Sequence, residues 1–447
     1  MEDTKNNKSV TSKIVNIVLI LVLLIVLVIT YNIYQSNNLN GLNKSEQKAN
    51  LTEFSKDENV KYSNTKSYKI ESEQFNDAML SKKVKIRENT PYKLSCMVRT
   101  KDVEAEKGSK GAGAQLSLAN TTQRSIAITG NNEWQKIELI FDSENRNEVE
   151  IGARLGGTAG NCKGTAWFSD FKLEEGIQDT SNEWKFACFI FKTTDVTLDG
   201  KETKLSMTKD DISDINSTLK RFASSCETLS EGKMTASYDV YNINTPISSL
   251  SYDNEFGYYV APEDIENQIK GTITGSDYDH IFIVLRLGND EHSDDIQVND
   301  WIGLGSMDYY GIGYSNIRLP NDSKSYMYKY NSRINTFPEE VFLHEFLHSL
   351  ERDSTEYGYN IPALHDYQKY GYENEKLIGQ MKWYQDYMNK QIQTTNGLIG
   401  LPEQVYTLKP AKSTNFSNPN EKDFVKQPQN FPEEIKELIA NLKQKIN

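Results

Sequence analysis

Residues 341–350 read Val-Phe-Leu-His-Glu-Phe-Leu-His-Ser-Leu. The preceding Thr336-Phe337-Pro338-Glu339 combines a threonine cap, a glutamate three residues later and a proline in the first turn, so we expect a helix from about Phe337. His344 and His348 are four residues apart and therefore project from one face of this helix, as two ligands of one metal ion must. The apolar residues of the run form a separate stripe that can pack on a core.

Glu345 directly follows the first histidine, so its carboxylate can reach a water near the metal without being a ligand itself. The chain has only 5 His in 447 residues, and a chance His-Glu-x-x-His pattern is expected in well under ~1% of such sequences. On these residues the segment resembles the zincin metallopeptidases. A helix with two histidines and a glutamate on an exposed face is the competing interpretation.

The resemblance implies a Zn²⁺ cofactor and peptide-bond hydrolysis, in which the ion lowers the pKa of a bound water and Glu345 takes up its proton. It also implies an antiparallel edge strand that holds the substrate. We expect that strand at Tyr310–Leu319, whose glycines would let a substrate backbone approach closely.

The third metal ligand is predicted to be His365, because histidine is scarce and this one follows soon after the helix. A later acidic residue is the alternative, and the candidates are Glu373, Glu356 and Asp366. The longer metzincin pattern fails, since Glu351 stands at its glycine position and Ser354 at its final histidine.

Supporting roles are assigned to three further residues. Glu351 lies one turn after His348 on the same helix face and is expected to accept a hydrogen bond from an imidazole N–H. Tyr367 is our candidate for stabilising the oxyanion of the transition state, and Tyr370 is the alternative.

The region around this helix, residues 183–400, reads as an α/β (α+β) domain. Continuous apolar or alternating runs predict strands, and spacings of three and four predict helices. The expected strands are 186–191, 236–241 and 278–287, and the expected helices are 208–225, 262–269 and 377–392. His280, which opens one of these strands, is expected to make a structural hydrogen bond.

Residues 66–177 predict an all-β sandwich, because short alternating runs are separated by Gly and Asn clusters. On Thr90–Ser95, Trp134–Lys136 and Gly164–Glu174 this stretch resembles jelly-roll carbohydrate-binding modules, which implies a glycan as a candidate partner. Trp134 and Trp167 could stack on sugar rings, but we favour a place for both in the core.

The N-terminal part predicts a membrane anchor. Residues 1–13 carry Lys5, Lys8 and Lys13, and residues 14–34 are almost entirely apolar, so we expect a cytoplasmic stub, a single transmembrane helix and an extracytoplasmic bulk. Secretion after signal-peptide cleavage is the alternative. We expect a solvated linker at 35–65 and a polar tail with a short terminal helix at 401–447.

Composition narrows the remaining possibilities. With 50 Lys+Arg and 63 Asp+Glu, the net charge of −13 argues against a nucleic-acid partner. The 4 Cys offer no C-x-x-C motif, although Cys96 with Cys162, or Cys188 with Cys226, could form disulfides. The acidic loop 289–295, which holds His292, could bind structural Ca²⁺, but it lacks an EF-hand pattern and reads better as a solvated turn.

The sequence therefore predicts a membrane-anchored extracellular zinc metallopeptidase acting on protein or glycoprotein substrates. The alternative is a non-catalytic surface glycan-binding protein or adhesin with a degenerate zincin domain. Retention of Glu345 favours the first hypothesis.

Overall fold

The structure is a computed structural model that describes residues 43–46, 51–158, 160–273, 277–288, 296–299, 301–319, 339–372 and 377–416. Within these ranges no helix has the length and apolar content that crossing a bilayer requires. The predicted anchor at 14–34, the start of the predicted helix at Phe337, the acidic loop 289–295 and the terminal helix of the tail all lie outside them.

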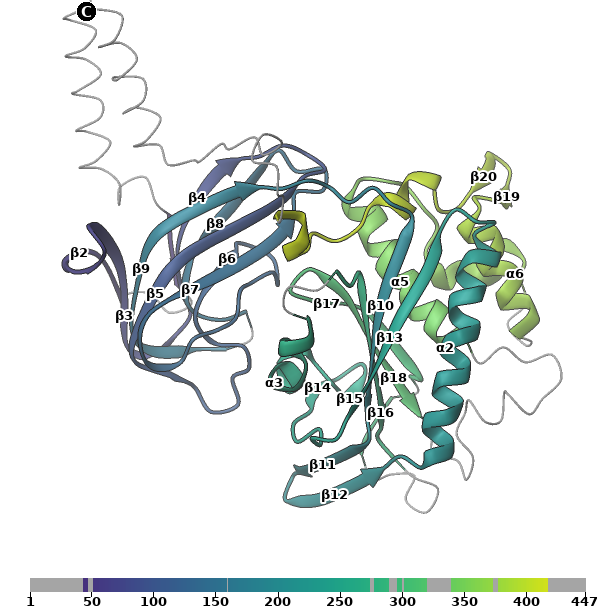
Figure 1. Ribbon diagram of the computed structural model, residues 1–447, viewed down its shortest axis with the longest axis horizontal. Helices are drawn as coiled ribbons and strands as arrows, with labels where there is room; N and C mark the ends of the chain where they lie inside the picture. Colours follow the sequence, from purple (N-terminus) through teal and green to yellow (C-terminus); the bar gives the residue numbers. More distant parts are fainter. Residues whose placement is uncertain are drawn as a thin grey trace, which may run out of the picture.

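The N-terminal part is an antiparallel β-sandwich (Figure 1). One sheet has the strand order β1-β4-β8-β6 and the other β2-β3-β9-β5-β7, and every strand pair in both is antiparallel. The strands are β1 (Asn43–Glu46), β2 (Thr52–Tyr62), β3 (Thr65–Asn76), β4 (Ala78–Lys85), β5 (Pro91–Ala105), β6 (Gly113–Leu118), β7 (Gly130–Asp142), β8 (Glu148–Gly156) and β9 (Cys162–Glu175). The two sheets share one buried apolar core, as the alternation in the sequence predicts.

Three expectations for this region need correction. The linker was expected to reach residue 65, but β1 and β2 lie within it. β2 is an edge strand whose side chains are half-buried or exposed, so it has no apolar alternation to reveal it, and backbone pairing with β3 forms it instead. Trp134 and Trp167 were expected in the core, yet both are half-buried and lie outside the core cluster.

The two disulfides that the sequence left open are not formed. Cys96, Cys162, Cys188 and Cys226 are all free and buried. Cys96 lies near Asp170 in the β5–β9 pairing, whereas Cys162 begins β9. About eight residues of strand therefore separate them, roughly 25 Å, far beyond the reach of a disulfide. Burial raises the thiol pKa of Cys162 to about 12.

The second domain is built on a five-stranded mixed sheet in the order β13-β10-β16-β18-β17. The first four strands are parallel, and β17 pairs antiparallel with β18 at the edge. The strands of this sheet are β10 (Glu183–Phe191), β13 (Thr235–Ile243), β16 (His280–Arg286), β17 (Gly303–Tyr309) and β18 (Ile312–Leu319). The predicted strands at 186–191, 236–241 and 278–287 are thus confirmed, with small shifts of their ends.

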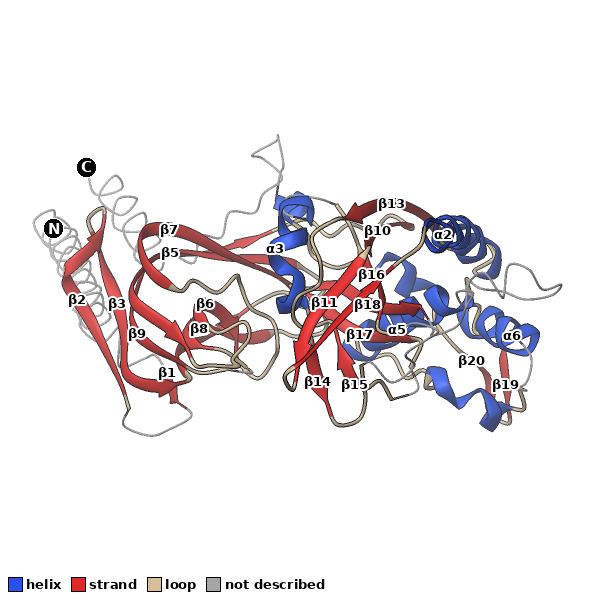
Figure 2. Cartoon of the chain, turned by 90° about the horizontal axis from the view of Figure 1, so that it is seen from below, coloured by secondary structure: helices blue, strands red, loops and turns tan. Residues whose placement is uncertain are grey.

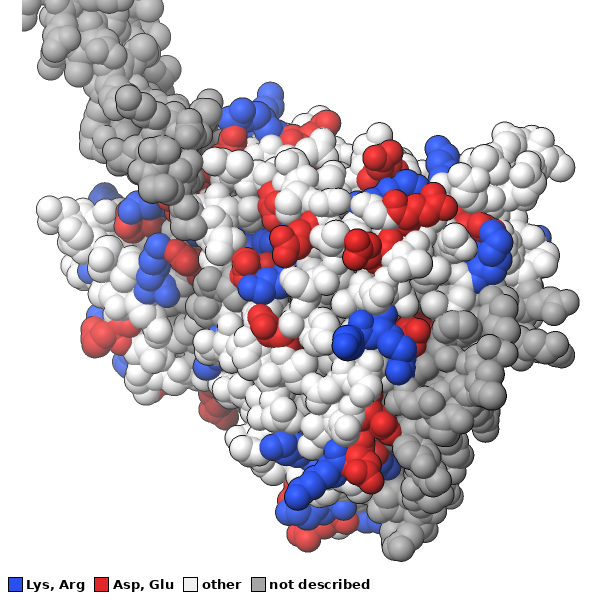
Figure 3. Space-filling model, turned by 45° about the vertical axis from the view of Figure 1, so that its right-hand side comes forward, with Lys and Arg blue, Asp and Glu red and all other residues white. Residues whose placement is uncertain are grey.

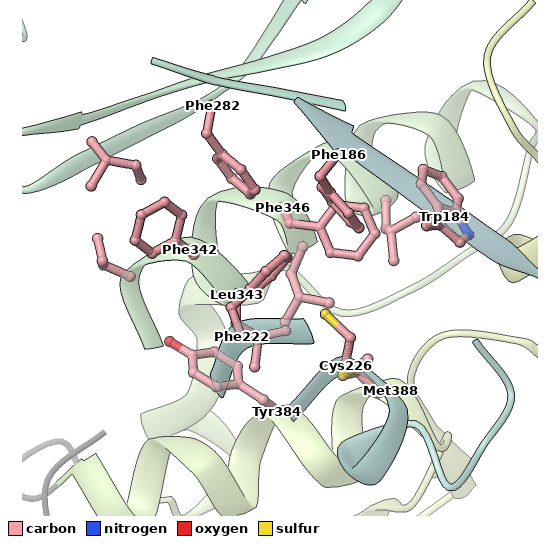
Figure 4. Packing of buried hydrophobic residues seen from close by; sticks show 14 of the residues in the cluster. Trp184, Phe186, Phe222, Cys226, Phe282, Phe342, Leu343, Phe346, Tyr384 and Met388 are labelled. Carbon is pink, nitrogen blue, oxygen red and sulfur yellow. The ribbon is translucent and has the colours of Figure 1, made fainter. Parts of the chain in front are cut away.

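Both faces of this sheet are covered (Figure 2). One face packs against α2 (Lys209–Leu229), α5 (Glu340–Glu356) and α6 (Leu377–Met388), and Figure 4 shows the aromatic cluster formed there. The other face packs against smaller elements: the hairpins β11 (Thr193–Leu198) with β12 (Lys201–Ser206) and β14 (Ser251–Asp253) with β15 (Gly257–Tyr259), and α3 (Pro262–Ile273). Alternate residues of β10 belong to the two cores, because successive side chains of a strand point to opposite faces.

The edge strand was expected at 310–319, and this expectation is wrong. Tyr310 and Gly311 form a two-residue turn in which both residues have positive φ, 51° and 92°. Such turns favour hairpins. The chain therefore reverses there, so β17 occupies the edge and β18 lies one strand inside it.

The C-terminal segment is part of the fold up to Phe416. It contains the short hairpin β19 (Ile392–Thr394) with β20 (Gly397–Ile399) and the 3-10 turns η2 (Glu403–Thr407) and η3 (Ser413–Phe416). The indole Nε1 of Trp184 donates to the Tyr406 carbonyl at 3.0 Å, and the buried ammonium of Lys412 donates to Asp279 at 2.6 Å. The expected polar tail therefore begins after residue 416 at the earliest.

Candidate metal centre

The catalytic-helix candidate, α5, is held on the sheet by its apolar face. Five apolar side chains of α5 are buried against β10, β16 and α2: Phe342, Leu343, Phe346, Leu347 and Leu350. Figure 4 shows Phe346 beside Phe186 and Phe342 beside Phe282. Because this face is fixed in the core, the opposite side of the helix presents His344 and His348.

Three imidazoles meet at one point. The Nε2 atoms of His344 and His348 are 3.2 Å apart, those of His344 and His365 are 3.2 Å apart, and those of His348 and His365 are 3.0 Å apart. His365 lies on η1 (Leu364–Tyr370), the first element after α5. Among the described residues, these three form the one group of His, Cys, Asp or Glu with metal-site spacing.

The other ring nitrogens define the tautomers. His348 Nδ1 faces Glu351 Oε2 at 3.0 Å, and because a carboxylate can only accept, Nδ1 carries the proton. His344 Nδ1 faces the Tyr384 hydroxyl at 2.9 Å. Because the Tyr384 O–H donates to Glu340, its oxygen accepts from His344 Nδ1. Both rings then carry their proton on Nδ1, and the Nε2 lone pairs of His344 and His348 face each other without a donor between them.

This arrangement fits a zinc ion. At a Zn–N distance of about 2.0–2.1 Å, tetrahedral geometry separates two ligand nitrogens by roughly 3.3 Å, close to the separations found here. A cation at the centre would replace the repulsion of the lone pairs by attraction. The set of three imidazoles that converge through Nε2 is thus chemically suited to zinc.

The charged form is disfavoured at two of the three histidines. The pKa of His344 lies well below its usual range, because burial and then the neighbouring His348 and His365 disfavour its charged form. The pKa of His365 is also lowered, chiefly by burial. Neutral imidazole is the form that binds metal.

Glu345 lies on the side of α5 that meets the edge strand. Its side chain is 4% exposed and packs against β17, where the backbone N–H of Gly305 hydrogen-bonds to it. A Cβ on Gly303 would overlap the Glu345 carboxylate, so glycine is required for this close approach. Burial, followed by the charge of Glu340, raises the pKa of Glu345 well above its usual range.

The other predicted site residues have mixed outcomes. Glu351 accepts from His348 as expected, and its second oxygen accepts from the backbone N–H of Leu364 at 2.8 Å. Asp366 pairs with Lys369 at 2.8 Å, so the structure brings His365 and not Asp366 to the other histidines. Glu373 lies outside the described residues.

Tyr367 is half-buried and packs against the helical core, and none of the described contacts joins it to the three histidines. Glu356 sits near Glu144 of the sandwich. His280, predicted to be structural, is fully buried and hydrogen-bonds through Nε2 to Ser315 at 3.0 Å.

Two residues at the site, Tyr384 and Glu340, were not predicted from the sequence. Tyr384 lies on α6 and bonds both to His344 and to the Glu340 carboxylate. Glu340 offers a signal in principle, because it is four residues before His344 on the same helix. Tyr384 offers none, since its contact depends on how α6 packs 40 residues later.

No protein-family model matches the sequence, and no curated protein matches it. Among solved structures, the module TmCBM61 in complex with β-1,4-galactotriose matches at 15% identity and a TM-score of 0.23, covering 31% of this chain and 92% of that one. The xylan-binding CBM22-1 domain of Paenibacillus barcinonensis Xyn10C matches at 14% identity and a TM-score of 0.19, covering 30% and 85%. The CBM22-1–GH10 modules of Clostridium thermocellum xylanase 10B, complexed with xylohexaose, match at 11% identity and a TM-score of 0.21, covering 79% and 62%.

Proposed function

We propose that the second domain is a zinc-dependent hydrolase whose substrates are peptides. The observation that carries the proposal is the convergence of the His344, His348 and His365 Nε2 atoms, with outer hydrogen bonds to Glu351 and Tyr384. The ion would be held by His344, His348 and His365. When bound, it polarises a substrate carbonyl as a Lewis acid and lowers the pKa of a bound water.

Glu345 is suited to move the proton. Burial raises the pKa of its carboxyl, which makes the carboxylate a stronger base for taking a proton from an attacking water and returning it to the leaving amine. Its position against β17 places it between the helix that bears the histidines and the sheet edge.

An extended peptide is the substrate that β17 suits best. β17 pairs with β18 on one side and is the last described strand of its sheet. Two of its backbone groups are already used by α5, because the Gly305 N–H bonds to Glu345 and the Met307 carbonyl accepts from Arg352. An added strand would pair with the backbone groups that remain. The bulge between Leu304 and Met307 interrupts regular pairing where β17 passes Glu345.

A glycan-binding role for the sandwich is the second candidate function, either beside catalysis or alone as an adhesin. Trp167 on β9 points away from the core, since its neighbours Ala166 and Phe168 are both buried. It pairs across the sheet with Arg99, and Trp134 on β7 lies 5.8 Å from the Tyr62 ring. Partly exposed aromatic rings beside charged side chains are suited to stacking and hydrogen bonding with sugars.

The apolar run at 14–34 supports a further part of the proposal. We place the two domains outside the cell on a single membrane anchor, because the basic residues precede that run. Protein or glycoprotein at the cell surface would then be within reach.

The test is cleavage of a mixed glycoprotein library by the full-length chain in detergent, with Glu345→Gln beside it. We expect the wild type to cleave and Glu345→Gln to bind zinc equally but to cleave at least ~10²-fold more slowly. Absence of cleavage by a zinc-loaded wild type, together with retention on immobilised glycan, would instead support the adhesin.

A further inference from the structure

Tyr384 stands between two buried groups of α5. Its ring is 1% exposed and lies at the margin of the aromatic cluster (Figure 4). Its hydroxyl contacts Glu340 Oε1 and lies 2.9 Å from His344 Nδ1. One turn of α5 separates Glu340 from His344, so both reach the same hydroxyl from one helix face.

The Tyr384 hydroxyl donates one of its two hydrogen bonds and accepts the other. The Tyr384 O–H donates to Glu340 Oε1, and this bond opposes the burial that raises the pKa of the Glu340 carboxyl. The hydroxyl oxygen then accepts from His344 Nδ1–H, and this leaves the lone pair of His344 on Nε2, where the other two histidines converge.

The same helix also holds the third histidine. The indole Nε1 of Trp383, the residue before Tyr384, donates to the carbonyl of Leu364 at 2.9 Å. Leu364 directly precedes His365, and its N–H donates to Glu351. Two neighbouring residues of α6 therefore hold two of the histidines in place: Tyr384 bonds to His344, and Trp383 bonds to the residue before His365. None of the three histidines lies on α6 itself.

We propose that Tyr384 and Glu340 form a positioning pair that fixes the tautomer of His344 and raises its basicity, so that α6 controls metal affinity. The inference rests on the proposed zinc site. Partners of this kind orient metal-binding imidazoles, and their loss typically lowers affinity by about 10–100-fold.

Tyr387 supplies a matched control. It is fully buried on the same helix, three residues after Tyr384, and its hydroxyl has no hydrogen-bond partner within the described chain. Tyr384→Phe and Tyr387→Phe therefore remove the same atom from the same helix, but only the first removes a bond to a histidine.

The experiment measures the zinc dissociation constant of the full-length protein by chelator competition, and the visible spectrum of its cobalt form. We expect Tyr384→Phe to weaken zinc binding by about 10–100-fold and to alter the cobalt bands, while Tyr387→Phe leaves both unchanged. Thermal unfolding of the metal-free proteins checks that both variants fold. Adding Glu340→Gln to Tyr384→Phe is expected to cost no further affinity, because Glu340 acts through the hydroxyl.

Wild-type affinity and spectrum in Tyr384→Phe would overturn the inference and leave the zinc site standing. An additive loss in the double variant would overturn the part assigned to Glu340. If the wild type itself retains no metal, the proposed function fails, and that result is distinct because it appears before any variant is compared.

Discussion

At the scale of single residues, the metal centre depends on spacing that a sequence can show and on contacts that it cannot. His344 and His348 were predictable because four residues place two side chains on one helix face. His365 was predictable because histidine is scarce. Tyr384 was not, since its contact with His344 is made by the packing of α6.

His365→Ala tests the third ligand. We expect zinc affinity to fall by more than the about 10–100-fold that loss of an outer hydrogen-bond partner costs, because His365 is itself one of the three ligands. Chelator competition measures the change. Asp366→Asn is the matched control at the adjacent position and should bind zinc as the wild type does. Equal loss in both variants would mean a disturbed η1 and not a lost ligand.

Gly303→Ala tests the packing of Glu345 on β17. The added Cβ would overlap the Glu345 carboxylate and displace it, so we expect kcat to fall by about 10²-fold with zinc content unchanged. Gly271→Ala, in α3 where a Cβ meets nothing within 4 Å, is the control. Unchanged kcat in Gly303→Ala would show that the position of Glu345 is not critical.

At the scale of elements, the long periodic segments were predicted well. The helix expected at 208–225 is α2, and its capping box between Thr208 and Asp211 is formed. The β11–β12 hairpin was missed, although Asp199-Gly200 signals a two-residue turn and both residues have positive φ. The edge strand was misplaced because the Tyr310-Gly311 turn was read as part of a strand.

Thr208→Ala tests the cap of α2. Loss of the side-chain bond to Asp211 N–H should lower the free energy of unfolding by about 1 kcal/mol, seen as a lower melting temperature. Ser217→Ala removes an exposed hydroxyl that bonds only to the preceding turn of the same helix, and we expect little change. A larger effect of Ser217→Ala than of Thr208→Ala would contradict the role of the cap.

At the scale of the whole molecule, the two domains are joined by charged contacts. Arg124 of the sandwich donates to Glu263 of α3 at 2.7 Å, and Lys110 pairs with Asp264. On the face drawn in Figure 3, acidic and basic side chains are intermixed over the described surface, so the net charge of −13 is not gathered there in one patch. The sequence could not predict this docking, because the paired residues are more than a hundred positions apart and belong to different domains.

A group of carboxyls also meets between the domains. Asp142 and Glu144 of the sandwich lie near Asp353 and Glu356 at the end of α5. Burial, followed by repulsion between neighbours, raises the pKa of Asp142 and Glu356 to about 7 and of Glu144 to about 6. Nearby positive charges and one backbone hydrogen bond lower these pKa values again, but only in part. The charges belong to Arg146, Arg352 and Lys412, and the hydrogen bond comes from the Ala411 N–H.

The sign of the pH effect follows from these raised values. Between about pH 4 and 7 the folded protein binds more protons than the unfolded chain, so this stabilisation is full at low pH and is lost as the pH rises through about 7. We expect Asp142→Asn to raise the melting temperature at pH 8 and to match the wild type below about pH 4, where the carboxyl is protonated in the folded and the unfolded chain. A variant that is less stable at pH 8 would contradict the raised pKa of Asp142.

The most direct measurement of the central claim is X-ray absorption at the zinc edge of the full-length protein. We expect one zinc per chain with an imidazole shell of three nitrogens at about 2.0–2.1 Å, reduced to two in His365→Ala. A protein that retains no zinc, or a shell that His365→Ala leaves unchanged, would contradict it.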